Sequence, residues 1–85
     1  MSTLSDYHNK MYRNLMAEAG GDIEHAVSLL WMHHEHFDGE YTIGYSAEVR
    51  MREALGYDAT EARRKLAEAH AAEDRMIAEY LARNP

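Results

Sequence analysis

The sequence predicts an all-α protein: a small four-helix bundle with one long C-terminal helix. Apolar residues recur at steps of three and four, glycines stand between these periodic stretches, and the only proline is the last residue. With 85 residues, of which 46% are hydrophobic, the chain is expected to fold as a single helical domain over residues 1–85. A chain of this length buries one small core at most.

The first two predicted helices are separated by Gly20-Gly21, a pair that typically ends a helix. The helix before it is predicted over residues 5–19. Asp22 is a suitable N-cap for the next helix, predicted over residues 22–37. The apolar face of this second helix is formed by residues at helical spacing: Ile23, Val27, Leu30, His34 and Phe37.

An aromatic-rich loop is predicted between helices 2 and 3. Asp38-Gly39 ends the second helix, and residues 40–45 combine β-branched and aromatic side chains with another glycine, which favours irregular or briefly extended chain. Ser46 is a candidate cap for a third helix that runs through Leu55 and stops at Gly56.

The fourth helix is predicted over residues 58–83, because Asp58 with Glu61 has the spacing of a capping box and no helix breaker follows before Asn84. Such a helix would be roughly 39 Å long, whereas a 15-residue partner reaches roughly 23 Å. Its apolar stripe continues to the end through Met76, Ile77 and Tyr80. We therefore expect a homodimer through helix 58–83, or packing against another protein.

Charge and composition limit the class of function. The formal net charge is −6, and residues 18–40 contain six acidic side chains with no Lys or Arg. This segment would steer the protein toward a basic surface. The longest near-apolar run is too short to span a bilayer, so we expect no membrane insertion. The lack of cysteine suits a reducing compartment, and we expect the protein to be cytoplasmic.

The most distinctive stretch is residues 31–45, which holds half of the eight aromatic residues of the chain. Aromatic anchors surrounded by charged groups are typical of protein interfaces. We predict a partner-binding surface formed by Trp31, Glu35, Phe37, Asp38, Glu40, Tyr41 and Tyr45. The alternative is that the loop folds back and buries these rings as a lid over the bundle.

A metal site is a second alternative, because histidine and carboxylate side chains from two helices could converge. The candidates are His34 on helix 2 with His70 and Glu73 on helix 4. A hydrogen-bonded polar cluster explains the same residues. No nucleophilic or phosphate-binding motif is present, so we predict neither enzymatic activity nor a cofactor.

Residues 47–66 support another alternative, a DNA-binding helix-turn-helix. Its candidate phosphate contacts are Arg50, Arg52, Arg63, Arg64 and Lys65, which stand among four acidic residues. Residues 51–69 also resemble the first two helices of ubiquitin-associated-like domains, and residues 20–30 resemble the last helix, in reversed order. Gly56 followed by a capping residue is equally what any tight helix–helix corner requires.

From the residues alone, the best-supported function is therefore non-enzymatic: a small acidic helical protein that binds another protein as an inhibitor or adaptor. The expected partner has a basic surface, as many nucleic-acid-handling proteins do. Small phage and mobile-element proteins offer an analogy for this mode of action. Nucleic acid itself is not the partner we expect.

Overall fold

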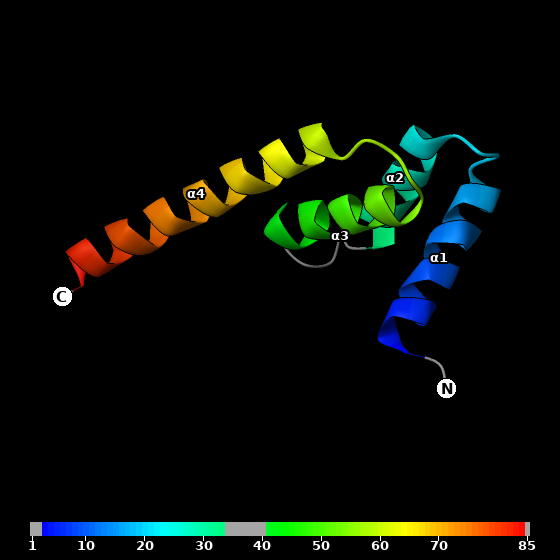
Figure 1. The fold of residues 1–85 in the computed structure, drawn as a ribbon. Coiled ribbons are helices and arrows are strands. Elements are labelled where there is room, and N and C mark those ends of the chain that lie inside the picture. The colour runs from blue at the N-terminus through cyan, green and yellow to red at the C-terminus, as the bar shows by residue number, and fades with distance from the viewer. Residues whose placement is uncertain (1–2, 34–40, 85) are drawn as a thin grey trace.

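The computed structural model describes residues 3–33 and 41–84. They form four helices, α1 (Leu4–Glu18), α2 (Ile23–His33), α3 (Tyr41–Ala54) and α4 (Thr60–Arg83), and no strand within the described ranges (Figure 1). The predicted all-α class, with four helices of which the last is the longest, is confirmed.

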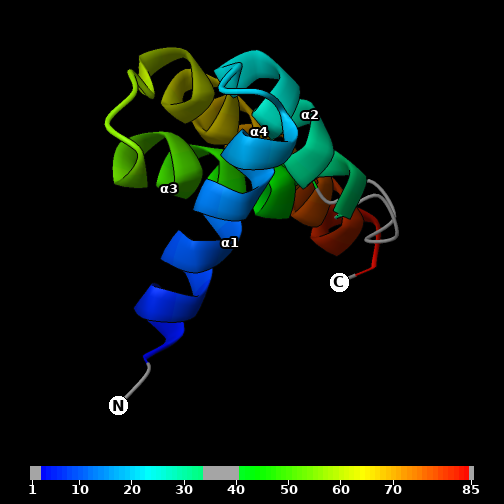
Figure 2. The same cartoon turned by 90° about the vertical axis from the view of Figure 1, so that its right-hand side faces the viewer.

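The four helices are arranged as a compact unit with an extension. Helices α1, α2 and α3 pack on one another, while α4 packs on α3 and runs antiparallel to it. The end of α4 projects away from this unit in Figure 1, and the beginning of α1 does so in both views (Figures 1 and 2). The radius of gyration is 15.3 Å, compared with about 12 Å for a compact domain of this length. The molecule is therefore elongated.

Local capping explains the ends of α1 and the beginning of α2. Thr3 and Asp6 form a capping box at the start of α1, so the helix begins at Leu4, one residue before the predicted start. Gly21 has a φ of 87° and its amide donates to the carbonyl of Met16, which closes the helix. Asp22 accepts a hydrogen bond from the amide of Glu24, in agreement with its predicted capping role.

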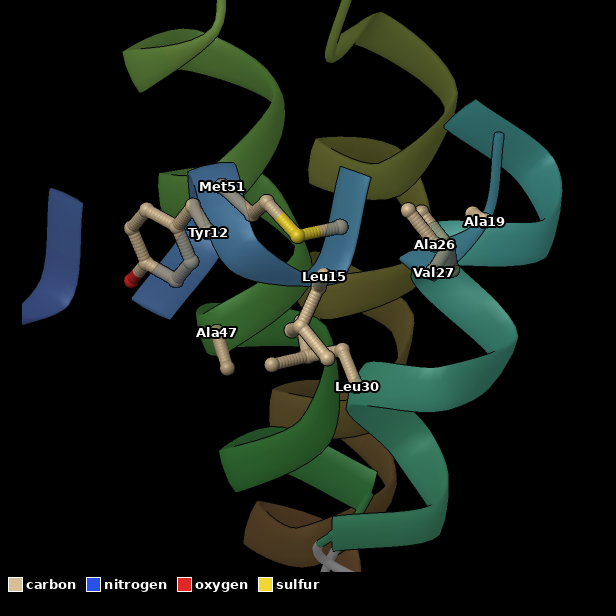
Figure 3. Packing of buried hydrophobic residues seen from close by; sticks show 8 residues of the cluster. All are labelled: Tyr12, Leu15, Ala19, Ala26, Val27, Leu30, Ala47 and Met51. Carbon is tan, nitrogen blue, oxygen red and sulfur yellow. The ribbon is translucent and has the colours of Figure 1, made fainter. Parts of the chain in front are cut away.

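The hydrophobic core lies between α1, α2 and α3. Leu30 and Met51 are the largest fully buried side chains. Figure 3 shows them in one cluster, with the Tyr12 ring at its edge and its hydroxyl pointing away from the other side chains. The remaining members are Leu15, Ala19, Ala26, Val27 and Ala47. On helix 2 the predicted core positions Val27 and Leu30 are buried, Ile23 is partly buried, and His34 and Phe37 lie outside the described residues.

The prediction of loop structure for residues 41–45 was wrong. These residues form the first turn of α3, and Ser46 lies inside the helix rather than capping it. Gly44 in this turn lies directly against the Trp31 ring, so close that an added Cβ would overlap it. Packing of this turn against α2 therefore outweighs the low helix propensity of glycine and the β-branched residues.

The predicted capping box at the start of helix 4 was also wrong. The helix begins at Thr60, and its N-cap residue is Ala59, which provides no side-chain hydrogen bond. Asp58 instead accepts hydrogen bonds from the amide and the hydroxyl of Thr60, and Glu61 pairs with Arg64. Ala59 is only 2% exposed. We attribute the later start of α4 to the burial of Ala59. This burial fixes the turn between α3 and α4, which begins at Gly56, where φ is 81°.

The two halves of α4 differ in burial. Ala62 is buried and Leu66 and Ala69 are partly buried beside α3, whereas the later large apolar side chains are exposed: Met76, Ile77, Tyr80 and Leu81. We call residues 74–83 the α4 arm. The predicted apolar overhang is thus present. Among the described helices, α4 included, none has the length and apolar character needed to cross a membrane.

Candidate interaction site along the α3/α4 seam

The candidate site follows the line along which α3 and α4 meet. On α3, Tyr41, Tyr45, Glu48 and Arg52 are spaced by four, three and four residues, which places them on one helix face. Glu61, Lys65 and Glu68 on α4 lie beside them. We call these seven residues the α3/α4 seam. Lys65 lines the concave surfaces at both of its ends.

One end of the seam is aromatic. A groove of about 390 Å³ is lined by Tyr41 and Tyr45 from α3 and by the α4 residues from Arg64 to Ala69 that face them. Tyr41 is 61% exposed, and its ring centroid lies 6.4 Å from that of Trp31. Tyr45 meets the Trp31 ring edge-on at 4.8 Å. This geometry is favourable for aromatic pairs and orients the tyrosines around the groove.

Trp31 on α2 packs against this aromatic end of the seam. Its indole Nε1 donates a hydrogen bond to the Glu48 carboxylate at 2.8 Å, and its ring lies against Gly44. The side chain is half-buried. The indole N–H and part of the ring therefore make contacts within the molecule, and Trp31 holds Tyr41 and Tyr45 in place.

Glu48 joins the aromatic end of the seam to the charged end. It is 8% exposed and accepts hydrogen bonds from Trp31 and, at 3.0 Å, from Nε of Arg52. Arg52 also donates to Glu24 at 3.1 Å. Burial alone would lower the pKa of Arg52, but the hydrogen bonds to Glu24 and Glu48 hold that pKa above its ordinary value. The network ties α2 to α3.

Sequence reasoning missed the roles of Glu48 and Glu24. The four-residue spacing of Glu48 and Arg52 is visible in the sequence and predicts an ion pair on one helix. The bond from Trp31 to Glu48 joins residues 17 positions apart, and the bond from Arg52 to Glu24 spans 28. No local sequence pattern encodes such contacts. The network forms only when α2 packs on α3, so it could not be predicted from the sequence.

The other end of the seam is acidic. A cleft of about 520 Å³ between α2, α3 and the start of α4 is lined by four carboxylates and two cations: Glu24, Glu48, Asp58, Glu61, Arg52 and Lys65. Hydrogen bonds from Thr60 lower the pKa of Asp58, and a hydrogen bond from Arg64 lowers that of Glu61. Both carboxylates are therefore ionised at neutral pH. The four carboxylates of the cleft outnumber its two cations, but Arg52 pairs with Glu24 and Glu48, and Arg64 pairs with Glu61, so the excess of negative charge is small.

The structure places only part of the predicted partner-binding surface. Trp31, Tyr41 and Tyr45 come together in one aromatic cluster. The other four predicted members, Glu35, Phe37, Asp38 and Glu40, lie outside the described residues. In the described ranges, two carboxylates adjoin the aromatic cluster: Glu48, which accepts the hydrogen bond from Trp31, and Glu68, which lines the groove with Tyr41 and Tyr45. The other carboxylates of the cleft lie further along the seam.

The residues proposed for DNA binding lie at the corner between the end of α3 and the start of α4, where the two helices run antiparallel to each other. Most of its cations are paired with carboxylates. Arg52 contacts Glu24 and Glu48, Arg63 contacts Glu53 at 2.7 Å, and Arg64 contacts Glu61 and Glu68. Arg50 donates to Ser46 and Lys65 lies in the seam. Because phosphate binding would have to compete with these carboxylates, the arrangement does not favour DNA.

The predicted metal ligands are only partly described. His34 lies outside the described residues, while His70 is exposed on α4 and Glu73 accepts a hydrogen bond from Thr42 at 3.3 Å. Within residues 3–33 and 41–84, no three histidine or carboxylate side chains form a group that could hold a metal ion.

Fold and site together define a small all-α protein whose concave surface has an aromatic end and an acidic end. Comparison with models of known protein families, with curated proteins and with solved structures finds no match.

Proposed function

We propose that this protein is non-enzymatic and binds another protein through the α3/α4 seam. The observation that carries the proposal is the position of the exposed Tyr41 ring at one end of a seam whose other end is acidic. Rigid aromatic side chains provide contact area at low entropic cost, and charged surroundings provide specificity and fast association. An inhibitor or adaptor that occupies a basic surface on its partner fits this arrangement.

Tyr41 would be the aromatic anchor that inserts into the partner, and Tyr45 would form the side of the groove on which the partner packs. Trp31 and Glu48 act as positioning residues, since they hold the aromatic rings but are themselves engaged within the molecule. The acidic cleft would attract a basic segment of the partner over distances of about a Debye length, roughly 10 Å at 0.1 M salt. Association should therefore slow as salt concentration rises.

Affinity capture with matched variants tests this proposal. Tagged wild-type protein, Tyr41→Ala and Tyr7→Ala are compared by quantitative mass spectrometry of captured proteins; Tyr7 is a similarly exposed tyrosine far from the seam on α1. A partner retained by the wild type and Tyr7→Ala but depleted at least about tenfold by Tyr41→Ala is expected. Equal capture by all three variants, with unchanged circular dichroism, would contradict a role for the seam.

We also propose that two copies associate through α4. The exposed apolar side chains of the α4 arm support this, because an apolar patch of this kind on a protein surface often marks an interaction site. Sedimentation velocity of the purified protein over a dilution series measures the association directly.

A further inference from the structure

The face of α4 that α3 covers continues beyond α3 into the α4 arm. Glu73 marks the limit of the covered part, because it accepts the hydrogen bond from Thr42 in the first turn of α3. Met76, Ile77 and Tyr80 follow Glu73 by three, four and seven residues, so they lie on the same face of α4. All three are exposed, and Leu81 lies at the edge of the stripe.

We propose that this stripe packs antiparallel against the same stripe of a second copy, with the tip of each α4 reaching the first turn of α3 in the other copy. The proposal rests on the self-association of α4 proposed above and specifies its geometry: the segment, the direction and the register.

The size of the stripe suits a second copy. Four large side chains that are each more than half exposed amount to roughly 400 to 500 Å² per chain, so a twofold pair would bury roughly 800 to 1,000 Å² in total. This is below the roughly 1,200 to 2,000 Å² of stable specific interfaces and in the range of weak or transient ones. A twofold contact is self-complementary, since the same patch faces itself, and so needs only the surface seen here. The dimer should therefore be weak and should dissociate on dilution.

The register follows from the position of α3. Tyr80 lies seven residues beyond Glu73, roughly 10 Å along the helix axis. If α4 of a second copy lay on the stripe, its end would meet the first turn of α3 near Glu73. The two α4 helices therefore overlap only over residues 76–84. The centre of that overlap is Tyr80. The two Tyr80 side chains should therefore meet at the twofold axis, with Met76 of one copy near Asn84 of the other.

The direction follows from the opposed orientations of α3 and α4 (Figure 1). In an antiparallel pair, α4 of the second copy runs parallel to α3, and its C-terminus meets the α3 N-terminus. The negative end of one helix dipole then lies beside the positive end of another, which is favourable. A parallel pair would place the C-termini side by side and lose this contact.

Charge substitutions on opposite faces of the arm test the interface. Tyr80→Glu would place two like charges at the axis, so the dimer should dissociate at least about tenfold more readily than the wild type in sedimentation velocity. Ala78→Glu is the matched control: Ala78 is exposed on the opposite face of the same turn, with one acidic and one basic neighbour, Asp74 and Arg75. Wild-type protein that stays monomeric at all concentrations would overturn both the self-association and its geometry.

Cysteine cross-linking tests the register separately, and the natural chain contains no cysteine. A disulfide needs Cα atoms within about 7 Å, so Tyr80→Cys should oxidise to a covalent dimer and Ala78→Cys should not. Met76→Cys should cross-link to Asn84→Cys in a mixture more readily than to itself. A dimer in which Tyr80→Cys stays reduced, or in which Met76→Cys links mainly to itself, would overturn this geometry while leaving self-association through α4 in place.

Discussion

The two halves of α4 share one apolar stripe but have different surroundings. Beside α3 the stripe consists of small or partly covered residues, with Ala62 buried and Leu66 partly buried. In the α4 arm it consists of large residues that are exposed, including Met76 at 70%. The half that lies against a neighbour within the chain needs small side chains to let two helices approach closely. The arm carries large apolar side chains that are exposed, which is why we propose that it forms an interface.

The largest expected difference in stability is between substitutions of two methionines, Met51 in the core and Met76 in the α4 arm. Met51 is fully buried in the core, so Met51→Ala should lower the free energy of unfolding by about 2 to 5 kcal/mol. Met76→Ala in the arm should change it by less than about 0.5 kcal/mol in dilute, monomeric protein. Urea denaturation followed by circular dichroism measures both, and similar losses for the two variants would show that the arm is covered within one chain.

A glycine under the aromatic cluster gives the next largest effect. In Gly44→Ala the added methyl group would overlap the Trp31 ring, which should destabilise the fold by about 1 to 3 kcal/mol. The fluorescence of Trp31, the only tryptophan, reports the displacement of the ring.

The effect of Gly44→Ala on stability should change sign when the Trp31 ring is removed. In a Trp31→Ala background, Gly44→Ala should stabilise the protein by up to about 1 kcal/mol, because alanine is the better helix former. Destabilisation of similar size in both backgrounds would show that the close packing of Trp31 on Gly44 is not the cause.

Buried and exposed ion pairs should also differ. Glu48→Ala removes the acceptor for Trp31 and Arg52 in a position that is 8% exposed, so it should cost about 1 to 3 kcal/mol. Glu53→Ala removes the pair with Arg63, in which both side chains are about half exposed, and should cost about 0 to 1 kcal/mol. Thermal unfolding at matched pH measures the difference, and equal losses would contradict the central role assigned to Glu48.

The smallest effect concerns pH at the start of α4. Hydrogen bonds from Thr60 lower the pKa of Asp58 in the folded protein below its ordinary value of 3.8. The ionised carboxylate therefore stabilises the fold above that value, and this contribution is lost as pH falls through the lowered pKa. Asp58→Ala should be less stable than the wild type at pH 7, and the difference should shrink below pH 3.8. A difference that is constant with pH would indicate a role independent of charge.

The sequence by itself determined the fold class, the number of helices and most of their ends. Gly20-Gly21, Asp22 and Gly56 act through backbone conformation and hydrogen bonds to near neighbours, so their effect is written in adjacent residues. The apolar end of α4 was likewise predictable, because helical spacing alone shows which residues share a face. The aromatic residues Trp31, Tyr41 and Tyr45 were identified as a group, although their surroundings were not.

Only the tertiary structure decided where α3 begins, where α4 begins and what Trp31 does. The turn at residues 41–45 is helical because it packs under the Trp31 ring, and α4 begins at Thr60 beside the buried Ala59. The acidic cleft collects carboxylates from α2, α3 and the start of α4. Each of these features depends on contacts between residues far apart in the chain, whose free energy exceeds the small local preferences that a sequence pattern expresses.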